Sequence, residues 1–193
     1  MNTLIDPNDV VCYTRDENEL QMFWLFCLVV AGKTAKTQAR LLDNFIQSLD
    51  SPYGEFNDTP MGRIHMAERQ GVLLDRIKES RLGQFNRLHK AFMQSTMVNL
   101  SEATVAELET IHGVGPKTAR MFVMMSRKDQ RYAALDTHVL KHLRANGVEA
   151  PLSTPSGGKK YDLLEQEFLK LADASEMEVA EYDLMVWKQY SQK

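Results

Sequence analysis

The chain has 193 residues, of which 44% are hydrophobic and 25% charged, proportions typical of a globular protein with a sizeable core. Its net charge of −3 argues against a surface that is basic throughout. Two cysteines, Cys12 and Cys27, are too few for a disulfide framework or a four-thiolate iron–sulfur cluster. We therefore expect an intracellular protein, cytoplasmic or, in a eukaryote, nuclear, that is neither secreted nor bound to a membrane.

In the first half of the chain the apolar pattern predicts helices and no β-strand. The most apolar stretch, residues 22–31, is too short to span a bilayer and follows charged residues, which indicates a buried core helix rather than a signal peptide. The segment 50–60 is rich in Pro, Gly, Asp and Asn and is expected to be a loop. The helices predicted here cover residues 17–31, 33–49, 60–80 and 84–98.

In the second half, helix starts are marked by capping residues. Thr104 and Glu107 form a candidate capping box for a short helix to residue 111. Pro116 suits the first position of a helix to residue 126, and Asp136 suits the N-cap of a helix that ends near Gly147. After a loop at 148–158, the last helices are expected at 159–173 and 176–190. The chain is therefore predicted to be all-α.

The strongest local signal is the string Ile-His-Gly-Val-Gly-Pro-Lys-Thr-Ala at residues 111–119. Gly113 and Gly115 flank the apolar Val114 between two short helices. Because glycine has no Cβ, the backbone N–H groups of such a hairpin can approach a phosphate oxygen, and the helix start adds its positive dipole end. A plain tight turn between helices would use the same residues.

Basic residues are concentrated around and after this string. Residues 112–145 contain seven basic and two acidic side chains, a net charge of +5. Such a window is compatible with a nucleic-acid surface and equally with a solvated helical face.

The string at 111–119 resembles the helix-hairpin-helix of the DNA glycosylase superfamily that includes endonuclease III and the 8-oxoguanine DNA glycosylases. Residues 134–139, Ala-Leu-Asp-Thr-His-Val, resemble the segment that carries the catalytic aspartate of that superfamily. Residues 26–35, 159–165 and 178–187 are similar to the small class of 8-oxoguanine glycosylases, so the resemblance covers most of the chain.

The resemblance implies a two-lobed helical fold with a DNA cleft between the lobes. One lobe would comprise residues 1–29 and 133–193, and the other residues 30–132 with the helix-hairpin-helix at 104–126. It implies a bifunctional DNA glycosylase and AP lyase of base excision repair that excises an oxidised base, 8-oxoguanine above all. The partner would be double-stranded DNA with a damaged base, bound by a monomer that requires no cofactor and has no iron–sulfur cluster.

By the same resemblance, Lys117 is the nucleophile and Asp136 the catalytic carboxylate. A lysine amine attacks the anomeric carbon and forms a Schiff base that permits β-elimination, and a carboxylate stabilises the oxocarbenium-like sugar. Without the resemblance, Lys117 is better interpreted as a surface lysine that contacts phosphate, and Asp136 as a simple N-cap.

The other candidate residues follow from the matching positions. The hairpin would bind DNA through Gly113, Val114, Gly115, Lys117 and Thr118. The base pocket would be lined by Trp187, Met121, Lys193 and His138, although Trp187 and Met121 also suit a core and His138 a hydrogen-bonded structural role. The backbone carbonyls of Glu109, Ile111 and Val114 would hold a monovalent cation.

Two other functions remain open from the sequence. The substrate could be another damaged or modified base, such as an oxidised pyrimidine. Alternatively, the chain could be a non-catalytic helix-hairpin-helix protein that binds DNA without cleaving it. Binding alone requires neither Lys117 nor Asp136 at their spacing, which favours the enzyme.

Overall fold

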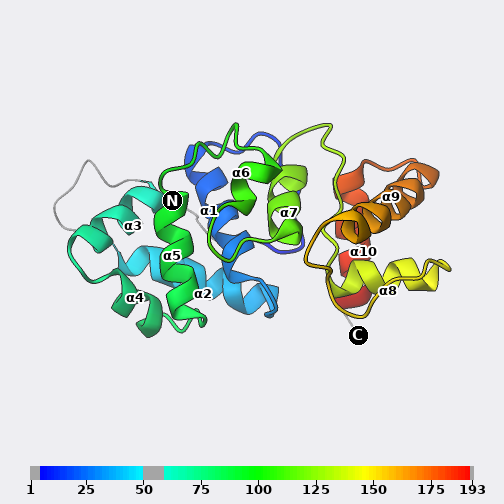
Figure 1. Ribbon diagram of the computed structural model, residues 1–193. Helices are drawn as coiled ribbons and strands as arrows, with labels where there is room; N and C mark the ends of the chain where they lie inside the picture. The colour runs from blue at the N-terminus through cyan, green and yellow to red at the C-terminus, as the bar shows by residue number, and fades with distance from the viewer. Residues whose placement is uncertain (1–4, 50–58, 192–193) are drawn as a thin grey trace. The chain divides into compact units, whose positions relative to one another are not determined.

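A computed structural model describes residues 5–49 and 59–191 of the chain. These residues form ten α-helices and no β-strand, which confirms the predicted all-α class (Figure 1). They belong to two compact units, Met1–Asp9 with Thr14–Val114, and Val10–Tyr13 with Gly115–Lys193. The helices of the first unit are α1 (Glu17–Val29), α2 (Ala35–Ser48), α3 (Pro60–Arg69), α4 (Leu73–Glu79), α5 (Phe85–Ser95) and α6 (Val105–Glu109). The helices of the second unit are α7 (Pro116–Ser126), α8 (Thr137–Ala145), α9 (Lys159–Ala174) and α10 (Val179–Ser191).

The first unit is built around α1, which is buried on all sides from Gln21 to Val29 and contacts α2, α3 and α5. This confirms the predicted buried core helix. The helix begins with a capping box in which the Asp16 side chain accepts the Glu19 N–H. Its one indole donor is satisfied, because Trp24 Nε1 donates to Ser95 Oγ at 2.8 Å.

Two predicted helices differ from the observed ones because the backbone takes a left-handed conformation. The helix predicted at 60–80 is divided into α3 and α4 at Gly71, which has φ +72°. The Gly71 N–H donates to Glu68 O and the Val72 N–H to Ala67 O, a helix-ending pattern that favours glycine. The last helix begins at Val179 rather than at 176, since Glu176 has φ +58° and cannot continue a right-handed helix. Most of the loop predicted at 50–60 lies outside the described residues.

The second unit contains α7 to α10 and a short segment near the chain start. The helices α8, α9 and α10 contact one another, and α7 contacts α10. The N-terminal segment belongs here because Cys12 N–H donates to Met125 O at 3.1 Å and Tyr13 Oη donates to Glu178 at 3.0 Å. The helix starts at Pro116 and Asp136 are as predicted.

The two units divide the chain differently from the lobes implied by the resemblance. Those lobes placed residues 17–29 with the C-terminal helices, whereas α1 packs inside the first unit. The predicted cleft between two lobes stays a prediction. No helix among the described residues is both long enough and apolar enough to cross a membrane.

Arg87 on α5 connects the hairpin to the end of α1 within the first unit. Its Nη2 donates to Leu28 O at 2.8 Å and its Nη1 to Gly113 O at 3.1 Å. The Leu28 carbonyl is one of the last in α1 and has no partner further along the helix. One guanidinium therefore satisfies a helix end and holds the start of the hairpin in place.

We predict that Arg87→Met destabilises the protein by about 2 kcal/mol, because the part-buried Leu28 carbonyl and the Gly113 carbonyl lose a charged donor while the aliphatic packing is kept. Urea denaturation measures the change in the free energy of unfolding. Arg76→Met is the matched control: Arg76 is exposed and pairs only with exposed Glu79, so its expected change is within about 0.5 kcal/mol. Equal effects of the two substitutions would contradict the role of Arg87.

Candidate functional site

The hairpin that follows α6 is closed by local hydrogen bonds. Thr104 and Glu107 form the predicted capping box of α6, and the Val114 N–H donates to Ile111 O at 3.0 Å. Gly113 has φ +76°, and a Cβ there would lie 2.6 Å from Arg87 Cγ. Glycine is therefore required at Gly113 by both its backbone conformation and its contact with Arg87.

Gly115 has a different role, because it is the N-cap of α7 and is open to its surroundings. Its φ is −111°, and a Cβ built there would meet no heavy atom within 4 Å. The N–H groups of Gly115 and Lys117 form no hydrogen bond with any described residue, and Pro116 between them has none to offer. The start of α7 thus presents two unpaired amide donors at the positive end of the helix dipole.

The structure separates the five predicted DNA-binding residues into two groups. The side chains of Val114 and Thr118 are buried, so these two residues hold the turn and the helix start in place. Gly113, Gly115 and Lys117 leave backbone or side-chain donors accessible. The chain passes from the first unit to the second between Val114 and Gly115.

Lys117 lies in the first turn of α7 and is half-buried. Its Nζ donates to the thioether sulfur of Met121, one turn later on the same face, at 3.2 Å. A thioether is a weak acceptor and carries no charge. Within the described part of the chain, no carboxylate lies within ion-pair distance of the Lys117 ammonium group.

Asp136 is the N-cap of α8, and its side chain is held rigidly. Its Oδ1 accepts the N–H groups of His138 and Val139, both at 2.8 Å. Its Oδ2 accepts no hydrogen bond from the described residues. The capping interpretation is therefore correct, and it leaves one carboxylate oxygen available for another partner.

Asp183, on α10, is a third member of this site that sequence reasoning missed. Its side chain is only 5% exposed, it accepts the Ala134 N–H, and its Oδ2 has no hydrogen-bond partner among the described residues. The pKa of Asp183 is raised to about 8, mainly by burial and then by the charge of Asp136, against the lowering effects of Lys117 and the Ala134 N–H.

Asp183 thus interacts electrostatically with both Lys117 and Asp136. The three residues come from α10, α7 and the N-cap of α8, respectively. The sequence did contain an indication that Asp183 is unusual. It lies four residues after Val179, on the buried side of a helix where a carboxylate requires an explanation.

The other predicted pocket residues lie near these three along their helices. Trp187 follows Asp183 by one turn of α10, and Met121 follows Lys117 by one turn of α7; both are half-buried. The ring of His138 forms no hydrogen bond with a described residue, so it is not the bonded structural histidine considered above. Lys193 lies outside the described residues.

The segment 133–136 is not helical. Its Asp136 N–H donates to Ala134 O, and side chains of α9 and α10 bind its backbone. Glu165 Oε1 accepts the Ala133 N–H at 2.8 Å. The Tyr161 hydroxyl donates to Ala133 O at 2.7 Å and accepts the Leu135 N–H at 3.1 Å. With Asp183 bound to the Ala134 N–H, three consecutive amides are fixed from neighbouring helices, and the position of Asp136 follows from them.

Arg120 completes the support beneath this segment. Its Nε donates to Glu165 Oε1 at 3.0 Å, and its guanidinium lies 4.6 Å from the Tyr161 ring centroid. Burial raises the pKa of Glu165, whereas the Ala133 N–H and Arg120 lower it. Arg120 is therefore part of the structural support and not a free cation for DNA.

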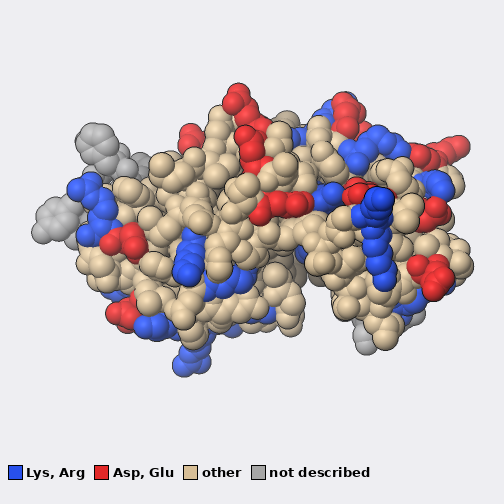
Figure 2. Space-filling view, viewed as in Figure 1, with Lys and Arg blue, Asp and Glu red and all other residues tan. Residues whose placement is uncertain are grey.

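The rest of the basic window is also largely engaged. Arg131 pairs with Asp173 at 2.9 Å, Arg144 donates to the carbonyl of Pro151, and Lys141 lies 5.2 Å from the Tyr190 ring centroid. Figure 2 shows basic and acidic side chains interspersed over the visible face. The local net charge of +5 therefore does not amount to seven free cations.

One of the three carbonyls predicted to hold a monovalent cation takes part in the hairpin itself. The carbonyl of Ile111 already accepts the Val114 N–H and keeps one lone pair for another contact. Among the described residues, no cluster of three or more His, Cys, Asp or Glu side chains could hold a metal ion. The monovalent cation at Glu109, Ile111 and Val114 stays a prediction.

Comparison with known proteins agrees with the hairpin geometry. Residues 96–123, which contain α6, the hairpin and most of α7, match the helix-hairpin-helix motif. No curated protein and no solved structure matched the chain. The chain thus carries a helix-hairpin-helix motif, consistent with the superfamily that its sequence resembles and with DNA binding in general.

We predict that Tyr161→Phe lowers the free energy of unfolding by about 2 kcal/mol, because one buried carbonyl and one buried N–H lose their partner. Urea denaturation measures this loss, and hydrogen exchange should show faster exchange at the Leu135 amide. Tyr13→Phe is the control, since its hydroxyl bonds an exposed carboxylate, and should change stability by less than about 0.5 kcal/mol. An unchanged Leu135 exchange rate would rule out the proposed support.

Proposed function

We propose that the protein is a bifunctional DNA glycosylase and AP lyase that excises an oxidised base, most specifically 8-oxoguanine. The observation that carries the proposal is that Lys117, a half-buried lysine on the second helix of a helix-hairpin-helix motif, and the rigidly held Asp136 at the N-cap of α8 both interact electrostatically with the buried Asp183. A module that only binds DNA has no need of this grouping.

The binding step uses the start of α7. The unpaired N–H groups of Gly115 and Lys117 suit a phosphate oxygen, and the open space at Gly115 permits the close approach of a nucleic-acid backbone. Contacts of this kind position DNA without reading its sequence. They suit an enzyme that finds a lesion in any sequence and takes the damaged nucleotide out of the stack.

The chemical step uses Lys117 and Asp136. The neutral Lys117 amine attacks the anomeric carbon of the extruded nucleotide; the N–C bond to the sugar forms, and the glycosidic bond breaks as the base leaves. The Asp136 carboxylate stabilises the positive charge that develops on the sugar. The attached nitrogen then loses a proton to the departed base, the C1′–O4′ bond breaks as O4′ takes up a proton, and a Schiff base results. The Schiff base permits removal of a proton from the adjacent carbon and β-elimination of the 3′ phosphate.

The base would be held between Met121 and Trp187. Each lies one helical turn beyond a member of the site, Met121 beyond Lys117 and Trp187 beyond Asp183. A thioether and an indole offer the polarisable apolar contacts that a flat base requires. The preference for 8-oxoguanine rests on the resemblance of the C-terminal segment.

We predict that Gly115→Ala weakens binding to duplex DNA about tenfold, or about 1.4 kcal/mol, because a methyl group blocks the approach of the phosphate. Fluorescence anisotropy measures the affinity. The free energy of unfolding should stay unchanged, since alanine is compatible with φ −111° and a Cβ meets nothing there. Lys128→Gln, at an exposed lysine beyond α7, should weaken binding less than about threefold. Wild-type affinity in Gly115→Ala would contradict the phosphate site.

We predict that borohydride traps a covalent complex between the protein and duplex DNA that contains 8-oxoguanine. Lys117→Gln should abolish trapping, and Asp136→Asn should reduce its rate by about 10²-fold or more while DNA binding persists. Gel electrophoresis detects the trapped species. No trapping by the wild-type protein, or undiminished trapping by Lys117→Gln, would reject the assignment of Lys117.

The same trapping experiment on a panel of lesions separates the alternatives. Trapping only on duplexes with oxidised pyrimidines would keep the enzyme and replace the substrate. Salt-sensitive binding without trapping on any lesion, and unaltered by Asp136→Asn, would instead identify a non-catalytic helix-hairpin-helix protein.

A further inference from the structure

The proposed chemistry leaves one requirement unassigned, which is the group that takes the proton from Lys117. An ammonium group is not a nucleophile, so the amine must lose a proton before it attacks. Asp136 is poorly suited to this task, because its carboxylate must stay charged to stabilise the sugar. Its Oδ1 is occupied by two backbone N–H groups, which leaves Oδ2 for that role. The carboxylate of Asp183, in contrast, interacts electrostatically with Lys117.

Asp183 has the geometry of a proton acceptor. The Ala134 N–H holds the carboxylate in place, and its Oδ2 has no partner although the side chain is 95% buried. A buried carboxylate oxygen without a donor is costly to maintain, and such groups are concentrated at sites where they act on a proton. The hydrogen bond from the Ala134 N–H does not by itself require a carboxylate, because a side-chain amide oxygen could accept it as well.

We propose that Asp183 takes the proton from the Lys117 ammonium group through one water molecule, and so prepares the amine for attack. This inference rests on the proposed glycosylase and lyase function. The transfer is balanced: an N–H bond of the ammonium group breaks, an O–H bond forms on the Asp183 carboxylate, and a neutral amine and a neutral carboxylic acid result. The carboxylic acid can return its proton to the departing base or to the sugar oxygen.

The surroundings of Asp183 suit this exchange at neutral pH. From α7 it faces Lys117, whose positive charge favours the carboxylate form, and from the N-cap of α8 it faces Asp136, whose negative charge favours the acid form. On α9 the Tyr161 hydroxyl is coupled to it, and Glu165 and Arg120 lie next to that hydroxyl. Burial also favours the acid form. The net result is a pKa of about 8 for Asp183, close to the neutral pH at which the proposed enzyme must work.

The test is single-turnover borohydride trapping on a duplex with an abasic site, where base recognition plays no part, from pH 6 to pH 10. We expect Asp183→Asn to trap about 10²-fold more slowly than the wild type at pH 7. The difference should shrink towards pH 10, where solvent hydroxide removes the proton instead. A merely structural role would lower the rate equally at every pH.

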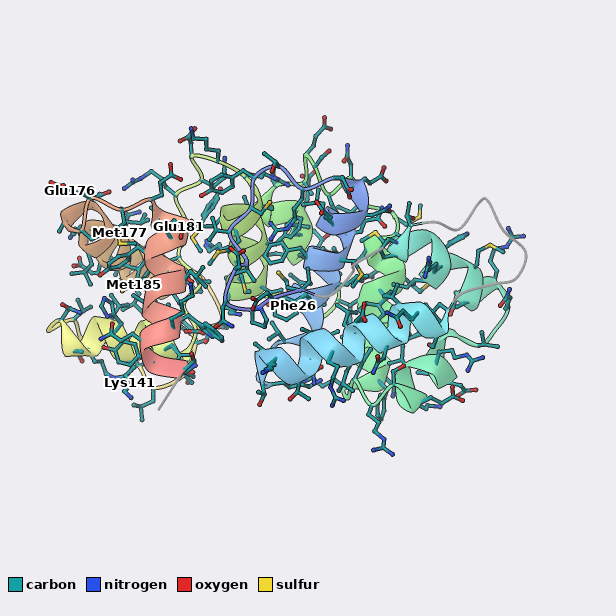
Figure 3. All side chains as sticks on the ribbon, turned by 180° about the vertical axis from the view of Figure 1, so that it is seen from behind. Phe26, Lys141, Glu176, Met177, Glu181 and Met185 are labelled. Atoms are coloured by element: carbon teal, nitrogen blue, oxygen red, sulfur yellow. The ribbon has the colours of Figure 1, made fainter. Side chains whose placement is uncertain are left out.

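Glu181→Gln is the matched control, because Glu181 is an exposed acid on the same helix, labelled in Figure 3. It should trap at the wild-type rate with the wild-type pH profile. Affinity for a duplex with a reduced abasic analogue, which cannot be cleaved, should be the same for Asp183→Asn and the wild type. Circular dichroism monitors the folding of each variant.

The outcomes separate the two proposals. If the wild-type protein traps no abasic DNA, the proposed lyase function fails. If the wild type traps and Asp183→Asn traps at the same rate with the same pH profile, the inference about Asp183 alone is wrong.

A measurement that does not depend on Asp183→Asn follows the carboxyl carbon of Asp183 by NMR in the wild type and in Lys117→Gln. The pKa of Asp183 should rise when the positive charge of Lys117 is removed. An unchanged pKa would show that the two groups do not interact, and would overturn the inference.

Discussion

The arrangement of the candidate site depends on which groups form hydrogen bonds with the backbone of residues 133–136. This segment is largely buried and non-helical in an all-helical unit, so apart from the bond from the Asp136 N–H to Ala134 O its polar groups have no ladder or helix to join. Side chains supply the partners: Glu165 and Tyr161 from α9, and Asp183 from α10. Because Asp136 follows directly, the same bonds that remove the cost of burying this backbone also fix the Asp136 carboxylate.

One consequence is that Asp183 serves two purposes that conflict. Its bond to the Ala134 N–H supports the backbone, while its burial beside Asp136 makes its charged form unfavourable. A buried carboxylate is a poor contributor to stability when an amide could make similar bonds. Its presence next to Lys117 is therefore better explained by chemistry than by folding.

The hairpin shows a similar division between structure and function. Gly113 is required by its left-handed backbone and by Arg87, whereas Gly115 has neither constraint. In the proposed function, a phosphate would bind the unpaired donors at the start of α7 rather than a broad basic surface, because Arg120, Arg131 and Arg144 are engaged within the protein. This agrees with a net charge of −3.

The sequence by itself determined the helical class, the buried helix α1, the capping residues Thr104 and Asp136, and the hairpin, because these depend on local periodicity and on side chains close in the chain. Its prediction of one helix over 60–80 was wrong at Gly71, where a helix-ending turn outweighed the apolar pattern. Only the tertiary structure revealed that Asp183 interacts electrostatically with Lys117 and Asp136. It also showed that most of the basic residues of the window 112–145 have partners within the protein. Burial and charge coupling join residues that lie 66 and 47 positions apart in the numbering, and no local pattern encodes such distances.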